Sequence, residues 1–274
     1  RALVDAGFPH VPVISLTLNS GISHNQPAFR INWLRILPIA LRAILYSDCI
    51  NKFYHAALVR ETRRGAAKEL RDHYLEIGSE LIERGHSHRL LEHITLAAHA
   101  FADICSDITL PRVGIVGEIY LKFNSFAHRG IVDWLAERQI EVDPPLLTGF
   151  FTQTFVNRKA RTAAHLLQPG VVDLAYSALY HLVRHEIHAV NQRASIFPYF
   201  IPFDDIRHEA NRAEQVITLN AQFGEGWLLP AEIIAYAQRG VDHVISLQPF
   251  GCIANQIVSK GVEKKLKTLY PQIN

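Results

Sequence analysis

The sequence has no methionine and only three cysteines in 274 residues. An average chain of this length contains several methionines, and this one begins at Arg1. We therefore expect either a fragment of a longer chain with its methionine positions missing or a stretch naturally free of methionine. Cys49, Cys105 and Cys252 are odd in number and far apart, which argues against a disulfide framework and favours a reducing compartment.

Long apolar runs and an excess of one charge are also absent. No apolar run reaches the length of a membrane span, and residues 1–10 lack the charged, apolar and small-residue regions of a signal peptide. The net charge is +2, with lysine and arginine dispersed among acidic residues. These absences predict a soluble cytoplasmic protein that binds neither nucleic acid nor membrane.

The residues that are present predict a folded protein with two unlike parts. With 49% hydrophobic residues the chain can bury one large or two medium cores. Residues 1–110 are predicted to be a mostly helical, truncated first lobe with one strand at 11–16. Apolar residues at three- and four-residue spacings predict its helices near 31–58, 65–84 and 87–105. Residues 110–112 are interpreted as a linker.

From residue 111 the pattern alternates between strands and helices, which predicts an α/β Rossmann-like lobe over 111–274. The predicted strands are 113–120, 140–147, 214–221 and 243–249. The predicted helices are 127–139, 150–167, 171–194, 230–238 and 252–269. Such alternation favours a parallel sheet with flanking helices and right-handed crossovers. The fold class is therefore α/β, with ligands expected at the carboxyl ends of the strands.

Three turns are predicted to meet at that edge, and each combines glycine with polar side chains. Glycine lets a backbone approach a ligand closely, and the polar groups can bind it. The alternative is that any α/β fold needs such turns and that their polar side chains are simply solvated. The candidate residues are Glu118, Asn220, Glu225, Gly226, Gln248 and Gly251.

Cys252 follows the last predicted strand and lies near the start of a helix. Exposed amide groups and the helix dipole favour a thiolate there, the form that binds metals or attacks electrophiles. The alternative is a buried cysteine that packs as a small hydrophobe. A nucleophile needs a base, and His243 lies at the opposite end of the preceding strand.

Other residues have competing interpretations. His181, His185 and His188 have a spacing that can bind zinc or nickel, although a solvated helix face is favoured. Trp134 is predicted to lie in the core between helix and sheet. Trp227 is predicted to serve either as a core residue or as a stacking platform.

Three segments carry a resemblance to a known family. "GIVGEIYLKFN" (114–124), "FGEGWLLPAE" (223–232) and "LQPFGCIANQIVSKGVEKKLKTLYP" (247–271) resemble the C-terminal, dehydratase-subunit-like region of large fused activators of 2-hydroxyacyl-CoA dehydratases. This family is related to the activator of 2-hydroxyglutaryl-CoA dehydratase. "ALVDAGFPHVPVISL" (2–16) also fits, so the resemblance extends over essentially the whole chain.

The resemblance implies a role in low-potential electron transfer in anaerobic metabolism. In that family the N-terminal part resembles actin-like ATPases, and the C-terminal part resembles dehydratase subunits, α/β lobes around an iron-sulfur cluster. No glycine-rich ATPase signature occurs here. The expected partners are the ATPase part of the same chain and, further, the dehydratase subunits or an acyl-CoA. This chain alone is expected to be inactive.

The same resemblance implies that Cys252 is a cluster ligand. Cys49 stands where the family commonly has an aliphatic residue, and Cys105 matches no motif. Because a four-iron cluster ordinarily takes cysteine at nearly every iron, we expect no cluster in this chain alone. In the intact protein, Cys252 and upstream cysteines would hold it.

Neighbouring residues acquire expected roles from this assignment. Glu118, Asn220 and the Glu225–Gly226 turn would line the approach to the cluster, while amides of the turn from Gln248 through Gly251 would tune its potential. Lys260 would contact CoA phosphates or belong to a solvated helix face. The alternative function is a cluster-free docking or regulatory domain for the ATPase part or the dehydratase partner.

Overall fold

The computed structural model describes residues 2–8, 10–11 and 32–274. The chain divides into two compact units, residues 1–40 and residues 41–274. The first contains helix α1 (Ala2–Asp5) and the beginning of α2 (Trp33–Leu58). Of the strand predicted at 11–16, all but the first residue lies outside the described residues. The linker predicted at 110–112 falls within the second unit.

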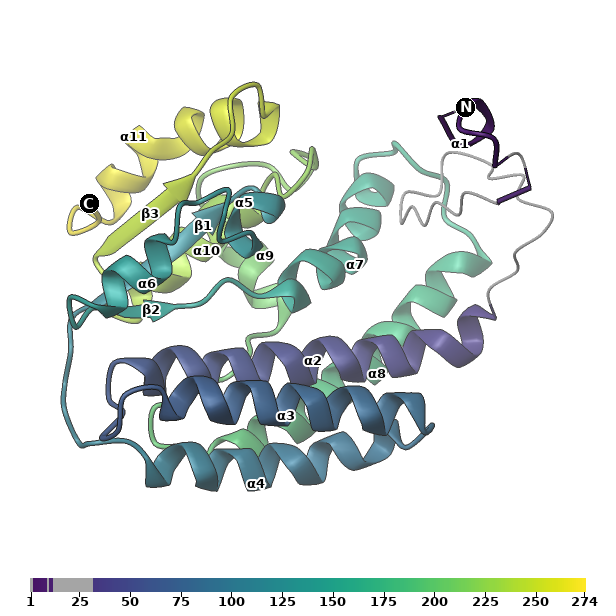
Figure 1. The fold of residues 1–274 in the computed structure, drawn as a ribbon. Helices are drawn as coiled ribbons and strands as arrows, with labels where there is room; N and C mark the ends of the chain where they lie inside the picture. Colours follow the sequence, from purple (N-terminus) through teal and green to yellow (C-terminus); the bar gives the residue numbers. More distant parts are fainter. Residues whose placement is uncertain (1, 9, 12–31) are drawn as a thin grey trace. The chain divides into compact units, whose positions relative to one another are not determined.

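Four helices of the second unit share one apolar core. The remainder of α2 lies beside α3 (Ala66–Glu83) and α4 (Leu90–Asp103), and α8 (Val171–Ala194) packs against α4 (Figure 1). A short 3-10 turn, η1 (Ser87–Arg89), precedes α4. Phe53 is fully buried, and its ring lies 5.8 Å from Phe101 and 5.1 Å from Phe197. Apolar side chains at helical spacing thus gather on one side of each helix, as predicted.

A three-stranded parallel sheet confirms the α/β class. Strands β1 (Arg112–Gly117), β2 (Glu141–Asp143) and β3 (His243–Leu247) lie in the order β2-β1-β3. β1 is central, with Val113 opposite Val142 and Ile115 opposite Ile245. Both neighbours run parallel to β1, so all three carboxyl ends lie at one edge of the sheet.

Helices cover both faces of β1. Val113 and Ile115 pack with Leu135 of α6 (Ile131–Ala136) on one face. Val116 packs on the other with α10 (Leu228–Gln238) and with Val262 of α11 (Lys260–Leu269). Successive side chains of a strand point to opposite faces, and coverage on both sides accounts for the burial of every β1 residue after Arg112.

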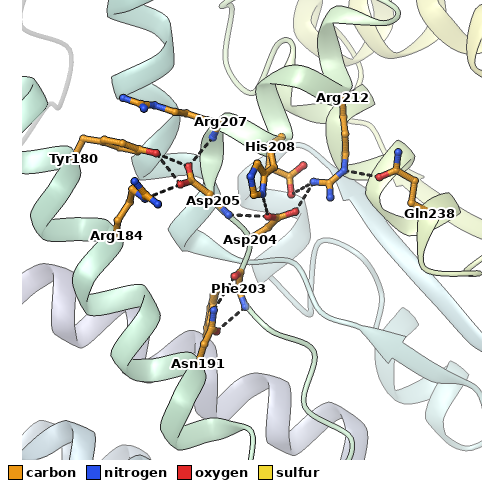
Figure 2. Close-up of polar contacts among 11 residues, drawn as sticks. Tyr180, Arg184, Asn191, Phe203, Asp204, Asp205, Arg207, His208, Arg212 and Gln238 are labelled. Carbon is orange, nitrogen blue, oxygen red and sulfur yellow. Dashed lines mark hydrogen bonds and ion pairs between the residues drawn. The ribbon is translucent and has the colours of Figure 1, made fainter.

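The end of the loop that leads into α9 (Ile206–Glu214) is held by side chains of α8 and α9 (Figure 2). The Asn191 amide donates to the Phe203 carbonyl and accepts from the Phe203 N–H, both at 2.9 Å. The Tyr180 hydroxyl donates to Asp205 at 2.7 Å, and Arg212 donates to Asp204. These contacts fix α9 between α8 and α10.

The prediction of a strand at 214–221 is wrong. Residue 214 ends α9, and the segment continues as a turn because the N–H groups of Val216 and Ile217 both donate to Ala213 at 2.9 Å. Val216 is buried against α10 and α11. The alternation of apolar residues therefore reflects packing between helices, and β3 occupies the edge of β1 opposite β2.

The environment of Trp134 and the starts of two helices also differ from prediction. Trp134 is not a core residue: its side chain is 48% exposed, and the Arg138 guanidinium covers its ring at 3.9 Å. The last helix begins as a π-helix, η2 (Ala254–Ser259), and continues as α11. Pro230 occupies the third position of α10, not the first. The helices predicted at 150–167 and 171–194 are confirmed as α7 (Leu147–Ala163) and α8.

Candidate functional site

The carboxyl ends of β1 and β3 meet the loop that precedes α10. The Glu118 N–H donates to the Leu247 carbonyl at 3.0 Å. The Ile119 N–H, at the start of α5 (Ile119–Phe123), donates to Glu225 Oε1 at 2.6 Å. We call this region, formed by residues 117–127, 223–227 and 248–257, the strand-end edge. The parallel topology brings the turns after β1 and β3 together, and the contact of Glu225 with α5 joins the loop before α10 to them.

Two glycines of the strand-end edge allow this close approach. Gly117 has φ 131° and Gly226 has φ 45°. A Cβ atom on Gly117 would lie 2.1 Å from the Leu247 carbonyl oxygen, and one on Gly226 would lie 2.1 Å from the Ala221 carbonyl oxygen. Gly251 has φ 85° but faces open space. Gly117 and Gly226 therefore serve backbone packing, whereas Gly251 leaves open space beside its Cα.

Cys252 is partly exposed and lies directly after the Gly251 turn. Its Sγ accepts a hydrogen bond from Asn255 Nδ2 at 3.2 Å. Asn255 is fully buried, and its Oδ1 has no hydrogen-bond partner within the described chain. A buried amide that donates to sulfur stabilises negative charge on that sulfur. The Cys252 sulfur is therefore held at the strand-end edge by a buried amide donor.

The polar side chains of the edge mostly hold its own backbone. Glu118 Oε2 accepts from the Leu121 N–H at 3.0 Å and caps α5. Glu225 is 2% exposed and is engaged with α5 as described above. Gln248 Nε2 donates to Ser246 Oγ at 2.9 Å. These three side chains stabilise the turns that present Cys252.

Two predicted site residues lie apart from this group. Asn220 is exposed and lines a groove of about 1310 Å³ between α7, α8 and α9, which none of the other candidates lines. Lys260 is exposed and pairs with Glu263 at 3.0 Å on the surface of α11. Trp227 is fully buried, and its Nε1 donates to Asn157 at 2.6 Å, so it is a core residue.

Large apolar side chains surround the strand-end edge and are open to solvent. Phe250 is completely exposed, and Phe126 and Phe223 are 92% and 73% exposed. Contiguous exposed apolar surface marks sites of interaction more often than isolated residues do. The full set comprises Tyr120, Phe123, Phe126, Phe223, Phe250, Ile253 and Ile257.

The other two cysteines lie among the helices and do not approach Cys252. Cys49 is fully buried in the α2 core, and burial raises the pKa of its thiol far above the ordinary value. Cys105 packs against the same core, and burial raises its pKa to about 11. Among the described residues, no three His, Cys, Asp or Glu side chains are grouped to hold a metal ion. His181, His185 and His188 are all exposed on α8.

A second region, which the sequence analysis missed, is a buried polar cavity of about 70 Å³. Its walls come from α2, the end of β2, α7, the loop before α9, and α9 and α10. The ionisable groups that line it are Lys52, Asp143, Asp204, Glu209, Glu232, Tyr236 and Arg239. Ionisable groups that converge on a cavity are a common property of functional sites.

Lys52 is the least compensated charge of the buried polar cavity. The residue is 5% exposed, and burial lowers the pKa of its ammonium group. Asp143 acts in the opposite direction, but its carboxylate is paired with Arg239 at 3.0 Å. The ring centroids of Phe200 and Phe203 lie 6.0 and 5.4 Å from Nζ. Most of the ammonium's surroundings are therefore apolar.

Two glutamates of the cavity each have one unsatisfied oxygen. Glu209 Oε2 and Glu232 Oε2 are buried without a hydrogen-bond partner in the described part of the chain. Burial raises the pKa of Glu209 to about 7 and also raises that of Glu232, which Lys122 opposes. Burial thus shifts both groups toward the protonated form, in which a carboxyl group donates a hydrogen bond, and the Lys122 ammonium opposes this shift at Glu232.

A sequence signal for this cavity existed. Lys52 lies one helical turn after Asp48 on the side of α2 that carries Cys49, and Glu232 is the single charge in an apolar helix. Charged residues on an apolar helix face are rare, so this pattern marks Lys52 and Glu232 in the sequence.

Comparison with known proteins does not identify a family for this chain. No family model, curated protein or solved structure matches it. Among the described helices, none combines the length and apolarity needed to cross a membrane.

Proposed function

We propose that this chain is a dehydratase-like module of a 2-hydroxyacyl-CoA dehydratase activator and presents Cys252 to an iron-sulfur redox centre in the intact protein. The observation that carries the proposal is the hydrogen bond from the buried Asn255 amide to Cys252 Sγ. A cluster-ligating thiolate is stabilised by such N–H donors, which also raise the reduction potential. The resemblance of residues 247–271 to that family supports the same assignment.

The donor set in the described residues fits one cluster ligand and not a complete site. Cys49 and Cys105 belong to the helical core, and each is held as a neutral thiol by burial. The remaining ligands therefore have to come from another part of the intact protein or from a partner. The apolar side chains around the strand-end edge provide the surface against which such a part can pack.

The test is the iron and acid-labile sulfide content of the anaerobically purified full-length protein, with an EPR spectrum, compared with Cys252→Ser. We expect Cys252→Ser to lose the iron of one cluster while its circular dichroism is unchanged. Cys105→Ser is the matched control, because it removes a partly exposed thiol that is far from the edge, and it should keep all iron.

Asn255→Leu sharpens this test. It removes the N–H donor to sulfur while preserving the side-chain volume approximately. We expect the cluster to remain and its reduction potential to fall, because the thiolate becomes more electron-rich. Iron content that is the same in wild type and Cys252→Ser would contradict the redox assignment.

A second candidate is a cluster-free docking or regulatory domain for the ATPase part or the dehydratase partner. The completely exposed ring of Phe250, beside Ile253 and Ile257, favours it. Phe250→Ser would then weaken binding of the dehydratase partner in a pull-down while Cys252→Ser would not. The redox assignment predicts instead that Phe250→Ser and Cys252→Ser both lower the iron content of the purified protein.

A further inference from the structure

The residues that line the buried polar cavity are not those of the strand-end edge, and Lys52 is the one cavity cation without an ion pair among the described residues. Buried charges in folded proteins are normally paired. Arg60 and Glu141 illustrate this, since they lie 2.7 Å apart and are both almost fully buried. Lys52 is buried to the same degree, yet the nearby Asp143 carboxylate is engaged by Arg239.

Burial and the positive charge of Arg239 oppose protonation of Lys52, and the two carboxylates that favour it, Asp143 and Asp48, are each engaged by another group. Within α2, Asp48 is engaged by Thr148, whose N–H and hydroxyl donate to it at 2.8 and 2.7 Å. Arg239, directly after α10, adds a positive charge that disfavours a second one. A desolvated lysine next to another cation is the environment that makes an amine nucleophilic at neutral pH.

Acid groups for proton transfer line the same cavity. Glu209 and Glu232 each direct one oxygen into a buried position without a partner. A carboxyl group whose pKa is near the working pH is an efficient proton donor and acceptor. The contacts of Figure 2 hold α9, and with it Glu209, in place through Asp204 and Arg212.

The size and charge of the cavity limit what it can hold. A cavity needs about 10–15 Å³ to admit one water molecule, so 70 Å³ accommodates several waters or a molecule of a few heavy atoms. Four carboxyl groups and two cations line it, which disfavours an anionic ligand. Arg239 is 34% exposed and Asp204 is 26% exposed, so the cavity meets solvent beside them.

From this arrangement we infer that Lys52 is an amine nucleophile that forms an imine with a small uncharged aldehyde or ketone. The Nζ lone pair adds to the carbonyl carbon, the C=O π pair moves to oxygen, and that oxygen takes a proton from Glu209 or Glu232. Nitrogen then loses a proton, and the resulting carbinolamine loses water to give the imine. The step is a condensation without net oxidation or reduction.

The experiment is reductive trapping on the full chain at pH 7 with glycolaldehyde and cyanoborohydride, followed by peptide mass spectrometry. Cyanoborohydride reduces an imine to a stable secondary amine, so the modified lysine is identified directly. We expect labelling at Lys52 at least tenfold faster than at Lys68, an exposed lysine on α3. The ratio should fall as pH rises to 10, because exposed lysines then lose their protons.

Three variants and a second probe make the test decisive. Lys52→Met and Lys52→Arg should remove the specific adduct and leave labelling of Lys68 unchanged. A double variant, Glu209→Gln with Glu232→Gln, should keep the circular dichroism spectrum and slow labelling at Lys52 alone. Labelling of Lys52 at or below the rate of Lys68 would overturn the inference. Faster labelling by anionic glyoxylate than by glycolaldehyde would overturn the assignment of an uncharged ligand.

Discussion

The strand-end edge and the buried polar cavity depart from the usual distribution of residues in opposite ways. At the edge, apolar side chains such as Phe250 and Phe126 are exposed, while the polar side chains are hydrogen-bonded to backbone. In the cavity, charged groups such as Lys52 are buried without adequate partners. Exposed apolar surface favours association with a large partner. Desolvated charge favours the binding or chemistry of a small one.

Lys122 connects the two regions and gives the largest expected effect. It follows β1 at the edge, its side chain is 2% exposed, and Nζ lies 3.6 Å from Glu232 Oε1. Lys122→Met leaves the Glu232 carboxylate without its cation, and we expect the free energy of unfolding to fall by about 3–5 kcal/mol. Urea titration followed by circular dichroism measures it. The surface variant Lys260→Met should lower the free energy of unfolding by less than about 1 kcal/mol. Equal losses for the two variants would show that Lys122 is no more important to stability than an exposed lysine.

Glycine substitutions test the packing of the edge. Gly117→Ala places a Cβ 2.1 Å from the Leu247 carbonyl oxygen at a positive φ. We expect a loss of about 3 kcal/mol or more, because backbone strain and overpacking add. Gly251→Ala has open space and should cost only the backbone strain, about 1–2 kcal/mol. If Gly117→Ala and Gly251→Ala shift the urea midpoint equally, Gly117 does not lie in close contact with the Leu247 carbonyl group.

The pH dependence of stability tests the cavity through Glu209. Its folded-state pKa is about 7 against an ordinary 4.5, raised by burial, with Arg212 opposing and Asp204 and Glu232 adding to the increase. The folded state thus binds more protons, and the free energy of unfolding falls as pH rises from about 4.5 to 7. Glu209→Gln should remove this decline, which is on the order of 3 kcal/mol. If the free energy of unfolding varies with pH in the same way for the wild type and Glu209→Gln, the raised pKa of Glu209 is contradicted.

The smallest expected effect has the opposite sign. Because burial lowers the pKa of Lys52, the folded state holds its proton less tightly than the unfolded chain, and the ammonium opposes folding at neutral pH. Lys52→Met should therefore stabilise the protein by about 1 kcal/mol or more. Thermal unfolding at pH 7 and pH 10 is the measurement, and the gain should shrink at the higher pH. A destabilised Lys52→Met would show that the ammonium is paired.

Local sequence patterns predicted the elements that short-range rules determine. The apolar run around Ile115 and the Pro- and Gly-bounded helix containing Glu232 are where the pattern places them. The pattern failed at Val216, since alternating apolar residues suit either a strand or a turn packed between helices. It failed again at Trp134, because the residues that face β1 on α6 are its neighbours.

By itself, the sequence determined the α/β class, the long helices, and the position of Cys252 after a strand, because these follow from periodicity and from the turn residues beside them. Only the tertiary structure decided that Asn255 donates to the Cys252 sulfur, that Asn220 lines a different groove, and that Lys52 shares a cavity with Glu232. Lys52 and Glu232 are far apart in the chain. Their proximity depends on how helices pack, and one-dimensional spacing does not encode that arrangement.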